Sequence, residues 1–474
     1  MEELPIHDGV FIGDENDRLE FKSVLKGIPG SVWETYSSFA NTFGGRIILG
    51  INDRTHEVEG VPDADRKVQD LWNSLNNPQI VNRNVLYSGS IRTYDADGKT
   101  LIIMDVPRTD RYLRPVYYKS LETGTFRRNG EDDYRCRMPE IGLMIRDQSS
   151  SSYDSTVLED MTFDDIDTDS LHAYRNEMRT YSPDHMWNGC TDREFARMIG
   201  AVGHSSEHLT VAGLLMFGKE PSINAFLPRF KLDYTEYPGT DETWSYRLVT
   251  GDGLWNGNIF NFFSAVRGRI SGGIDRPLKI GSDMRRIADT DVHRAVRECL
   301  LNTLIHADYL GSLLVKIERF PKEIRFSNSG LFRIPLEIAE RGGESDPRNA
   351  VIAKMFSMIG LMERAGVGIS YVFSTWKKQF GKVPVIREDT GNQRVAVVLS
   401  MGRKDTLTTG EMIMNLISKD PKISAARMSS EIGVSVPTVK NHLRRLTEEG
   451  VVRRVGGTRG HWEIIRMTGA DVLR

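Results

Sequence analysis

The stretch Gly433–Gly450, GVSVPTVKNHLRRLTEEG, decides the fold of the last part of the chain. Ser435 is placed to cap a helix, and Pro437 follows just inside its first turn. Apolar residues then recur at helical spacing, which predicts one buried face made by Val439, Leu443 and Leu446. The outward face keeps side chains that can donate hydrogen bonds to phosphates or base edges, namely Thr438, Lys440, Asn441, Arg444 and Arg445.

The flanks of this helix complete a familiar pattern. Two amphipathic helices are expected upstream, over 410–419 and 424–432. Downstream, VVRRVGGTRGHWEII (451–465) predicts two β-rich runs around a Gly-Gly turn. The whole resembles a winged helix-turn-helix, and the alternative is a solvated basic helix without a ligand. The resemblance implies DNA binding through Ser435, Thr438, Lys440, Asn441, Arg444, Arg445, Arg453 and Arg459.

The distribution of charge supports a local contact with nucleic acid. From Arg403 to Arg474 there are 13 Lys and Arg against 8 Asp and Glu, an excess of +5. The whole chain carries −3, so the remaining residues carry about −8. A basic end on an acidic body is the electrostatic footprint expected of a DNA-contacting module.

The bulk composition excludes several classes of protein. The chain has 474 residues, 39% apolar and 27% charged, which is typical of a globular protein of about three domains. No stretch approaches the roughly 20 apolar residues of a membrane span, and the acidic start has no signal-peptide core. Three cysteines (Cys136, Cys190 and Cys299) lie far apart, which argues against a disulfide frame or a structural zinc. We expect a cytoplasmic α+β multidomain protein with no membrane partner.

Two polar segments, the first of them a predicted linker, divide the sequence into blocks. The segment DQSSSSYDST (147–156) is Ser-rich and lacks core residues, and GRKDTLTT (402–409) is polar. They separate blocks 1–146, 157–401 and 404–474. The middle block is expected to divide near residue 285, because no chemistry can be assigned to 157–284. That part is predicted to be a connecting α/β region.

The first block predicts a small α+β domain. A helix over about 33–41 leads to the Gly44-Gly45 turn and the strand RIILGIN (46–52), and a second strand, TLIIMDVP, covers 100–107. In the run Glu20-Phe21-Lys22 the polar residues alternate with an apolar one. Glu20 and Lys22 should therefore lie on the same face of a strand.

This block resembles the Schlafen/AlbA-like domain. The resembling motifs are Glu15 with Glu20-Phe21-Lys22, FANTFGG (39–45), GIND (50–53) and RNG (128–130). In nuclease members three carboxylates hold Mg²⁺ or Mn²⁺, which here would be Glu15, Glu20 and Asp53, with Lys22 against a phosphate. Asn52 stands where a second acidic residue is common. The alternative is a structural Glu20–Lys22 ion pair in a domain that only binds RNA, DNA or a protein partner.

The third recognisable element is an amphipathic helix over 291–309. Its apolar face comprises Val292, Ala295, Val296, Cys299, Leu300, Leu304 and Ile305. Glu298, Asn302 and His306 repeat every four residues on a polar stripe, so their side chains should point to a common place. A hairpin over 314–326 closed by Asn328-Ser329-Gly330 follows, and then a helix opened by Gly366-Val367-Gly368.

This order resembles the GHKL ATPase fold in its divergent form, an α/β sandwich that binds ATP and Mg²⁺. The resemblance implies Glu298 as general base, Asn302 as Mg²⁺ ligand and His306 beside them. Asn328 and Gly330 would lie on the adenine side, and Gly366 with Gly368 near the phosphates. Asn328 replaces the family's aspartate and the glycine loop is a lone GxG, so hydrolysis could be slow or absent. The alternative is a solvated helix face.

The three parts together resemble Schlafen/AlbA-like, ATP-binding, winged-helix proteins described as transcriptional regulators. The leading prediction is a homodimeric DNA-binding regulator whose DNA binding or dimerisation responds to ATP. The competing prediction is a metal-dependent nuclease acting on RNA or DNA, with the winged helix for targeting. A helicase-like role is disfavoured, because the sequence has no GxxxxGK[ST] motif.

Overall fold

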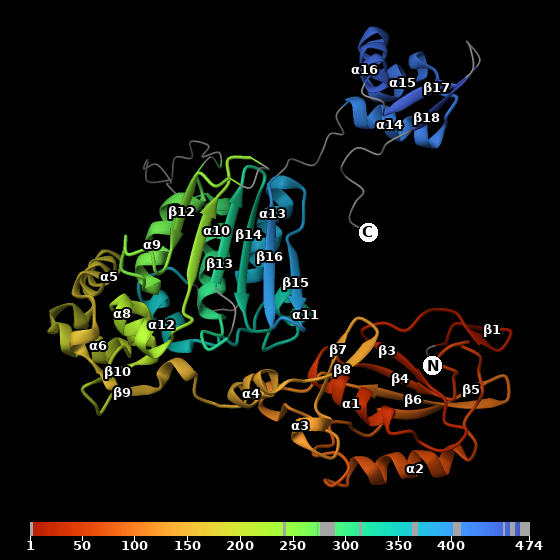
Figure 1. The fold of residues 1–474 in the computed structure, drawn as a ribbon, viewed down its shortest axis with the longest axis horizontal. Coiled ribbons are helices and arrows are strands. Elements are labelled where there is room, and N and C mark those ends of the chain that lie inside the picture. Colours follow the sequence, from red (N-terminus) through yellow and green to blue (C-terminus); the bar gives the residue numbers. More distant parts are fainter. Residues whose placement is uncertain are drawn as a thin grey trace. The chain divides into compact units, whose positions relative to one another are not determined.

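The computed structural model of the chain forms two compact units, residues 1–379 with 383–401, and residues 402–474 with 380–382. It describes residues 3–239, 243–272, 274, 290–311, 315–362, 368–401, 409–448, 451–455 and 460–464. Figure 1 shows its helices and strands. Within these ranges no helix is both long and apolar enough to span a bilayer.

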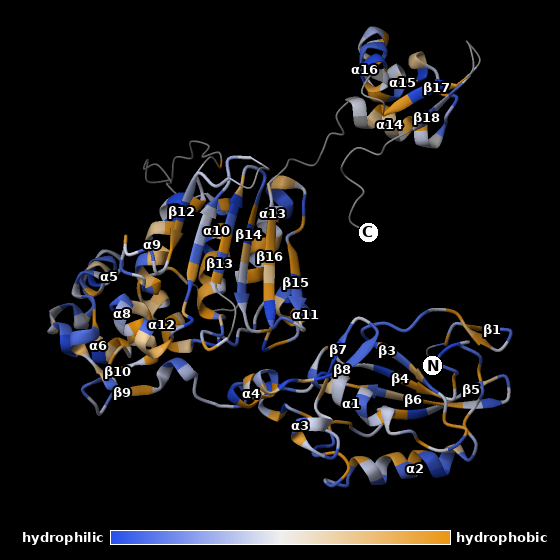
Figure 2. Ribbon diagram, viewed as in Figure 1, coloured by the Kyte–Doolittle hydropathy of each residue, from blue (hydrophilic) through white to orange (hydrophobic). Residues whose placement is uncertain are grey.

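The N-terminal domain of the larger unit is built on a four-stranded sheet of order β3-β4-β6-β5. The strands are β3 (Leu19–Lys22), β4 (Gly45–Leu49), β5 (Ile91–Ala96) and β6 (Lys99–Val106), and only β3 and β4 are parallel. Alternation along β4 buries Ile47 and Leu49 against α1 (Ser31–Asn41) and α2 (Ala64–Leu75). Ile48 packs on the other face with Phe11 and Phe21. Figure 2 shows the apolar colouring along β4 and β6 that marks this core.

Two small hairpins and two helices complete the N-terminal domain. They are β1 (Ile6–His7) with β2 (Val10–Phe11), β7 (Phe126–Asn129) with β8 (Asp132–Arg135), α3 (Leu121–Gly124) and α4 (Met138–Asp147). Asn41, at the end of α1, connects this helix with the segment around Val116 and with strand β7. Its side-chain amide donates to the carbonyls of Val116 and Phe126 and its oxygen accepts from Val116 N.

A helical region follows and packs around one aromatic cluster. Its elements are β9 (Val157–Thr162), α5 (Thr168–Tyr181), α6 (Asp192–Ile199), β10 (His208–Thr210), α7 (Val211–Phe217), α8 (Glu220–Phe226) and α9 (Ile259–Ile270). The Tyr174 ring of α5 lies 5.2 Å from that of Phe217 and 5.6 Å from that of Phe260. Since Phe260 belongs to α9, this cluster ties the helical region to the sheet beyond it.

The central domain has a six-stranded sheet of order β12-β11-β13-β14-β16-β15. Its strands are β11 (Leu232–Glu236), β12 (Tyr246–Val249), β13 (Val315–Phe320), β14 (Glu323–Ser329), β15 (Val385–Asp389) and β16 (Arg394–Ser400). Helix α9 packs on β11, and α10 (Asp291–Ile305) packs on β14 and on α9. The remaining helices are α11 (Leu336–Arg341), α12 (Ala350–Met358) and α13 (Gly368–Phe380). The arrangement is an α/β sandwich (Figure 1).

The structure refines three predictions in this region. The sheet takes β11 and β12 from the part predicted to be a connecting region, so the division expected near residue 285 does not coincide with an edge of the sheet. The turn of the β13–β14 hairpin is at 321–322, whereas Asn328 and Ser329 end β14. Helix α10 stops at Ile305, earlier than the predicted Tyr309, and Asn349 Nδ2 donates to the carbonyls of Ile305 and Ala307 at and beyond its end.

The smaller unit has the predicted helix–helix–helix–wing order. Helices α14 (Thr409–Lys419), α15 (Ala425–Ile432) and α16 (Val436–Glu448) precede the hairpin of β17 (Val452–Val455) and β18 (His461–Ile464). Val439, Leu443 and Leu446 are buried in one core with Ile413 and Met428, which confirms the predicted inward face. Ser435 Oγ accepts a hydrogen bond from Thr438 N at 3.4 Å, as the capping prediction requires.

Candidate nucleotide site and nucleic-acid interface

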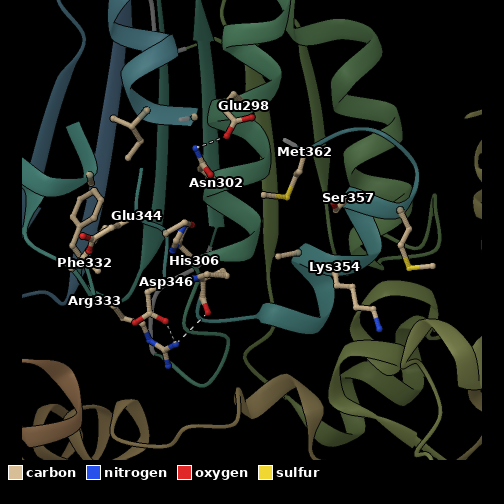
Figure 3. A pocket seen from close by; sticks show the side chains of 18 of the residues that line it. Glu298, Asn302, His306, Phe332, Arg333, Glu344, Asp346, Lys354, Ser357 and Met362 are labelled. Carbon is tan, nitrogen blue, oxygen red and sulfur yellow. Dashed lines mark hydrogen bonds and ion pairs between the residues drawn. The ribbon is translucent and has the colours of Figure 1, made fainter. Parts of the chain in front are cut away.

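The polar stripe of α10 lines a cavity of about 590 Å³. Glu298, Asn302 and His306 all face it, and Asn302 Nδ2 donates to Glu298 Oε1 at 3.3 Å (Figure 3). The apolar face predicted for the same helix is buried throughout. The spacing therefore places the three polar side chains together because the opposite face of α10 is held against the sheet.

A narrower apolar recess continues from this cavity. It shares Asn302, His306 and Phe332 with the larger cavity, and Asn328 and Gly330 lie on its wall. The rest of the wall is mostly apolar and includes Cys299, Leu331, Ile369, Val372, Val395 and Val397. A cavity lined on one side by polar and charged side chains and joined to an apolar recess fits a ligand with a charged part and a flat, weakly polar part. ATP is a ligand of this kind.

Asn328 and Gly330 occupy their places for identifiable reasons. Asn328 is buried, and its Nδ2 donates to Ser329 O at 2.9 Å, which leaves Oδ1 as an acceptor. Gly330 has φ of +92°, and a Cβ there would overlap the Arg348 guanidinium. Only glycine adopts this conformation without strain and also leaves room for Arg348.

Two arginine side chains, Arg348 and Arg333, surround the His306 end of the polar stripe. Arg348 Nη1 donates to His306 O at 2.7 Å, and Arg333 Nη1 lies 3.5 Å from Asp346 Oδ1, the contact drawn in Figure 3. Burial of the His306 imidazole, together with the charges of Arg348 and Arg333, lowers its pKa to about 3. His306 is therefore neutral at physiological pH and can act as a hydrogen-bonding group in the cavity.

The glycine pair predicted near the phosphates is described only in part. Gly366 lies outside the described residues. Gly368 begins α13 and lines the cavity, so close to Glu298 that a Cβ on it would overlap the carboxylate. Glu298 and Gly368 are thus brought together from segments about 70 residues apart in the sequence.

Several lining residues were not singled out from the sequence. They are His185 and Trp187, which precede α6, and Phe332, Arg333 and Lys354 of the central domain. The run Ser345–Asn349 belongs to the ordered set of motifs that resembles the GHKL fold, and its Ser345, Asp346 and Pro347 line the cavity. His185 and Trp187 gave no signal, since nothing in a single sequence links them to α10.

The N-terminal carboxylates are arranged differently from the predicted metal site. Glu20 and Lys22 of β3 share a face and form an ion pair, and Arg128 Nη2 lies 2.6 Å from Glu20 Oε2. Glu15 Oε1 accepts from Phe21 N at 2.7 Å, and Asp53 is exposed. Burial is the main cause that raises the pKa of Glu15, and the Glu20 charge adds to it. Among the described residues no three His, Cys, Asp or Glu side chains are grouped to hold a metal ion.

Two of the predicted DNA-contacting side chains, Lys440 and Arg444, line one hollow of the smaller unit. Lys440, Asn441, Arg444 and Arg445 are exposed on α16. Lys440, Arg444 and Thr447 share a hollow with Arg454 and Trp462 of the wing. Arg453 pairs with Glu463, with Nη2 to Oε2 at 2.8 Å, so its charge is partly neutralised. Arg459 lies outside the described residues.

Comparison with protein families agrees with this geometry. Residues 15–137 match the model "Schlafen, AlbA_2", residues 314–399 match "Putative ATP-dependent DNA helicase recG C-terminal", and residues 408–453 match "Winged helix-turn-helix DNA-binding". The chain thus carries, in order, segments similar to a Schlafen AlbA_2 domain, an ATPase-like domain and a winged helix. Residues 142–233 match a domain of unknown function, DUF8451. The architecture predicted from the sequence and its α+β multidomain class are thereby confirmed.

Other comparisons add little. No match was found among curated proteins. A crystal structure of the DIP2311 protein from Corynebacterium diphtheriae is 17% identical, with 97% of this chain and 94% of that chain covered and a TM-score of 0.41.

Proposed function

We propose that the protein is a DNA-binding regulator whose affinity for DNA, or whose dimerisation, responds to ATP and Mg²⁺. The observation that carries the proposal is the Glu298–Asn302–His306 stripe lining a cavity of about 590 Å³ in a chain that also carries a winged helix. Nucleotide pockets of this order of size are common. An exposed basic helix alone would support only constitutive DNA binding.

The residues of the cavity divide the recognition of the nucleotide among them. The recess with Asn328 and Gly330 takes the base, and Asn328 Oδ1 accepts from its amino group. Asn302, whose Nδ2 is engaged with Glu298, offers Oδ1 to Mg²⁺. Mg²⁺ supplies neutralisation of the phosphate charge when it is bound. Glu298 is the acceptor for a proton from water, should hydrolysis occur.

A regulator needs two states that bind nucleotide and DNA with different affinities. Winged-helix dimers contact two half-sites at a fixed spacing, so a nucleotide that favours one dimer arrangement changes affinity for DNA without touching it. A coupling of about 1–3 kcal/mol would change the affinity roughly 5- to 150-fold.

The switch is tested with operator DNA selected from a random library. Fluorescence anisotropy should give a different dissociation constant with ATP and Mg²⁺ than without them. Asn302→Ala should lose this response and keep the nucleotide-free affinity, whereas Asn392→Ala, an exposed asparagine next to β15, should behave as wild type. Identical affinities and footprints with and without nucleotide would remove the proposal.

Gly368→Ala tests the nucleotide site itself. The added Cβ forces the Glu298 carboxylate out of its place in the cavity, and we expect about tenfold weaker ATP binding, on the order of 1.4 kcal/mol. Isothermal titration calorimetry measures the effect. Gly391→Ala is the matched control, because a Cβ there would make only an ordinary contact, 3.6 Å from Asp389 Oδ1. Equal affinities of the two variants would place the nucleotide elsewhere.

A further inference from the structure

Two arginines of the N-terminal domain, Arg108 and Arg114, contact one short segment of the central domain, and the charge of a third, Arg127, acts on both. Arg108 Nη2 donates to Phe332 O at 2.6 Å, and Arg114 Nη2 lies 3.3 Å from Arg333 O. Because the two carbonyls belong to consecutive residues, the two guanidinium groups lie near each other. Arg127 of β7 is only 2% exposed, and its charge acts on both of them.

These guanidinium groups have more donors than the surrounding protein satisfies. The Nε atoms of all three arginines, and Nη1 of Arg127, are buried without a hydrogen-bond partner among the described residues. Buried N–H groups in proteins are almost always bonded, and a charged donor left without an acceptor is destabilising. The unmatched donors of Arg127 and Arg114 are the more telling because both side chains are at least nine-tenths buried.

Nearby carboxylates are already engaged. Glu388 Oε1 accepts from Phe332 N at 2.8 Å, and Glu337 pairs with Arg18. Asp147 accepts from Arg333 and Arg348. Burial lowers the pKa of Arg114 to about 9, with the Arg108 and Arg127 charges acting in the same direction. Burial also lowers the pKa of Arg108. The protein thus gathers three like charges where water is scarce.

We propose that Arg108, Arg114 and Arg127 form a binding site for a small phosphate-bearing dianion, either free phosphate or the phosphate group of a metabolite. Glu337 and Asp147 pair with other arginines, so Glu388 is the carboxylate left to offset the three guanidinium charges, and a dianion would neutralise the remaining two. Guanidinium groups bind phosphate oxygens through paired N–H donors, and this matches the donors left free here. Nothing in this proposal depends on ATP binding in the cavity along α10.

The proposed phosphate site lies beside a segment that also lines the candidate nucleotide site. Phe332 lines both the cavity and the recess of the candidate nucleotide site, and Arg333 lines the cavity. The carbonyls of these same two residues accept hydrogen bonds from Arg108 and Arg114. A phosphate that redirects those arginines would act on the segment that shapes the nucleotide site.

The full chain is titrated with orthophosphate, and separately with glucose 6-phosphate, at ionic strength held constant with chloride. The melting temperature of wild type should rise, on the order of 2 °C, and saturate. Arg127→Met should lose the response. Arg387→Met, an exposed arginine of β15, should keep it, and so should Asn302→Ala in the nucleotide cavity. A response to orthophosphate alone identifies the free ion, and a response to both identifies the phosphate group as what is recognised.

Two results would overturn the site. One is a wild-type response no larger than that to chloride, which would mean that buried water satisfies the donors. The other is a response that survives in Arg127→Met, which would place the anion elsewhere. If Arg127→Met does not fold, Arg127→Lys keeps the charge and removes the paired donors. It should respond more weakly than wild type, and an undiminished response would equally overturn the proposal.

Discussion

Asp147→Ala is expected to lower the free energy of unfolding of the larger unit by about 3–5 kcal/mol, the typical cost of removing one partner from a buried ion pair. Asp147 ends α4, and its carboxylate accepts from four N–H groups of two arginines. The distances are 3.0 and 2.8 Å from Arg333 Nε and Nη2, and 3.3 and 3.0 Å from Arg348 Nε and Nη2. Both arginine side chains are buried, so the alanine variant leaves two guanidinium charges poorly compensated.

The neighbouring residue provides the control. Arg146 lies in the last turn of α4 and pairs with Asp308, with Nη2 to Oδ2 at 3.0 Å, but its side chain is 37% exposed. The Asp308 carboxylate is buried but also accepts from Leu310 N at 3.2 Å, so Arg146→Met should cost clearly less than Asp147→Ala. Urea unfolding of the full chain, followed by tryptophan fluorescence, measures both variants. Equal midpoints for the two would show that the Asp147 contacts do not hold the N-terminal and central domains together.

The effect of pH has a definite sign. Burial alone would raise the pKa of Asp147, but the charges and hydrogen bonds of Arg348 and Arg333 hold it well below its usual value. A carboxyl whose pKa is lowered on folding adds stability above its unfolded pKa of about 3.9, and this stability is lost as the pH falls through the folded value. The difference between wild type and Asp147→Ala should thus be constant near neutral pH and narrow only below about pH 4.

Asp147 also shows where prediction from the sequence ends. The run 147–156 contains few apolar residues and was predicted to be a linker. In the structure the side chains of its two aspartates accept hydrogen bonds from residues far away in the sequence. Asp147 binds Arg333 and Arg348, and Asp154 Oδ2 accepts from Ile352 N at 2.9 Å, at the start of α12. Polar anchors of this kind join residues about 200 positions apart, and no local pattern encodes them.

The stripe of α10 was predictable for the opposite reason. Glu298, Asn302 and His306 share a face because helical geometry repeats every 3.6 residues, and the seven apolar residues of the opposite face identify the buried side. Which segments close the cavity was only partly predictable. Gly368 followed from the resemblance to GHKL proteins, whereas Phe332 and Trp187 depend on how β14 and the region before α6 meet α10.

The N-terminal carboxylates show another limit of prediction from the sequence. The alternation in Glu20-Phe21-Lys22 predicted a shared face, and the ion pair between Glu20 and Lys22 confirms it. The sequence could not show that Arg128, more than 100 positions away, also contacts Glu20. This contact bears on the predicted metal site, because a carboxylate held between two cations is a poorer ligand for a third.

Arg444→Ala is expected to weaken DNA binding by about 1–3 kcal/mol, roughly 5- to 150-fold. The Arg444 side chain is exposed on α16, and its Nη2 lies 3.2 Å from Asn441 Oδ1, which orients the guanidinium along the helix. Arg454, with its guanidinium carbon 5.0 Å from the centre of the Trp462 ring, lines the same hollow. Two positive charges therefore face one surface, and removing either should weaken its hold on an anionic backbone.

The salt dependence of binding separates the two roles open to Arg444. If it contacts a phosphate, Arg444→Ala should weaken binding to all sequences alike and lower the slope of log K against log salt by about 1. If it contacts guanine, the loss should fall on one base position and leave the slope nearly unchanged. Arg427→Ala is the matched control, since Arg427 is an exposed arginine of α15 that pairs with Glu431 at 3.3 Å. An Arg444→Ala variant that binds DNA as Arg427→Ala and wild type do would remove this face of α16 from the DNA interface.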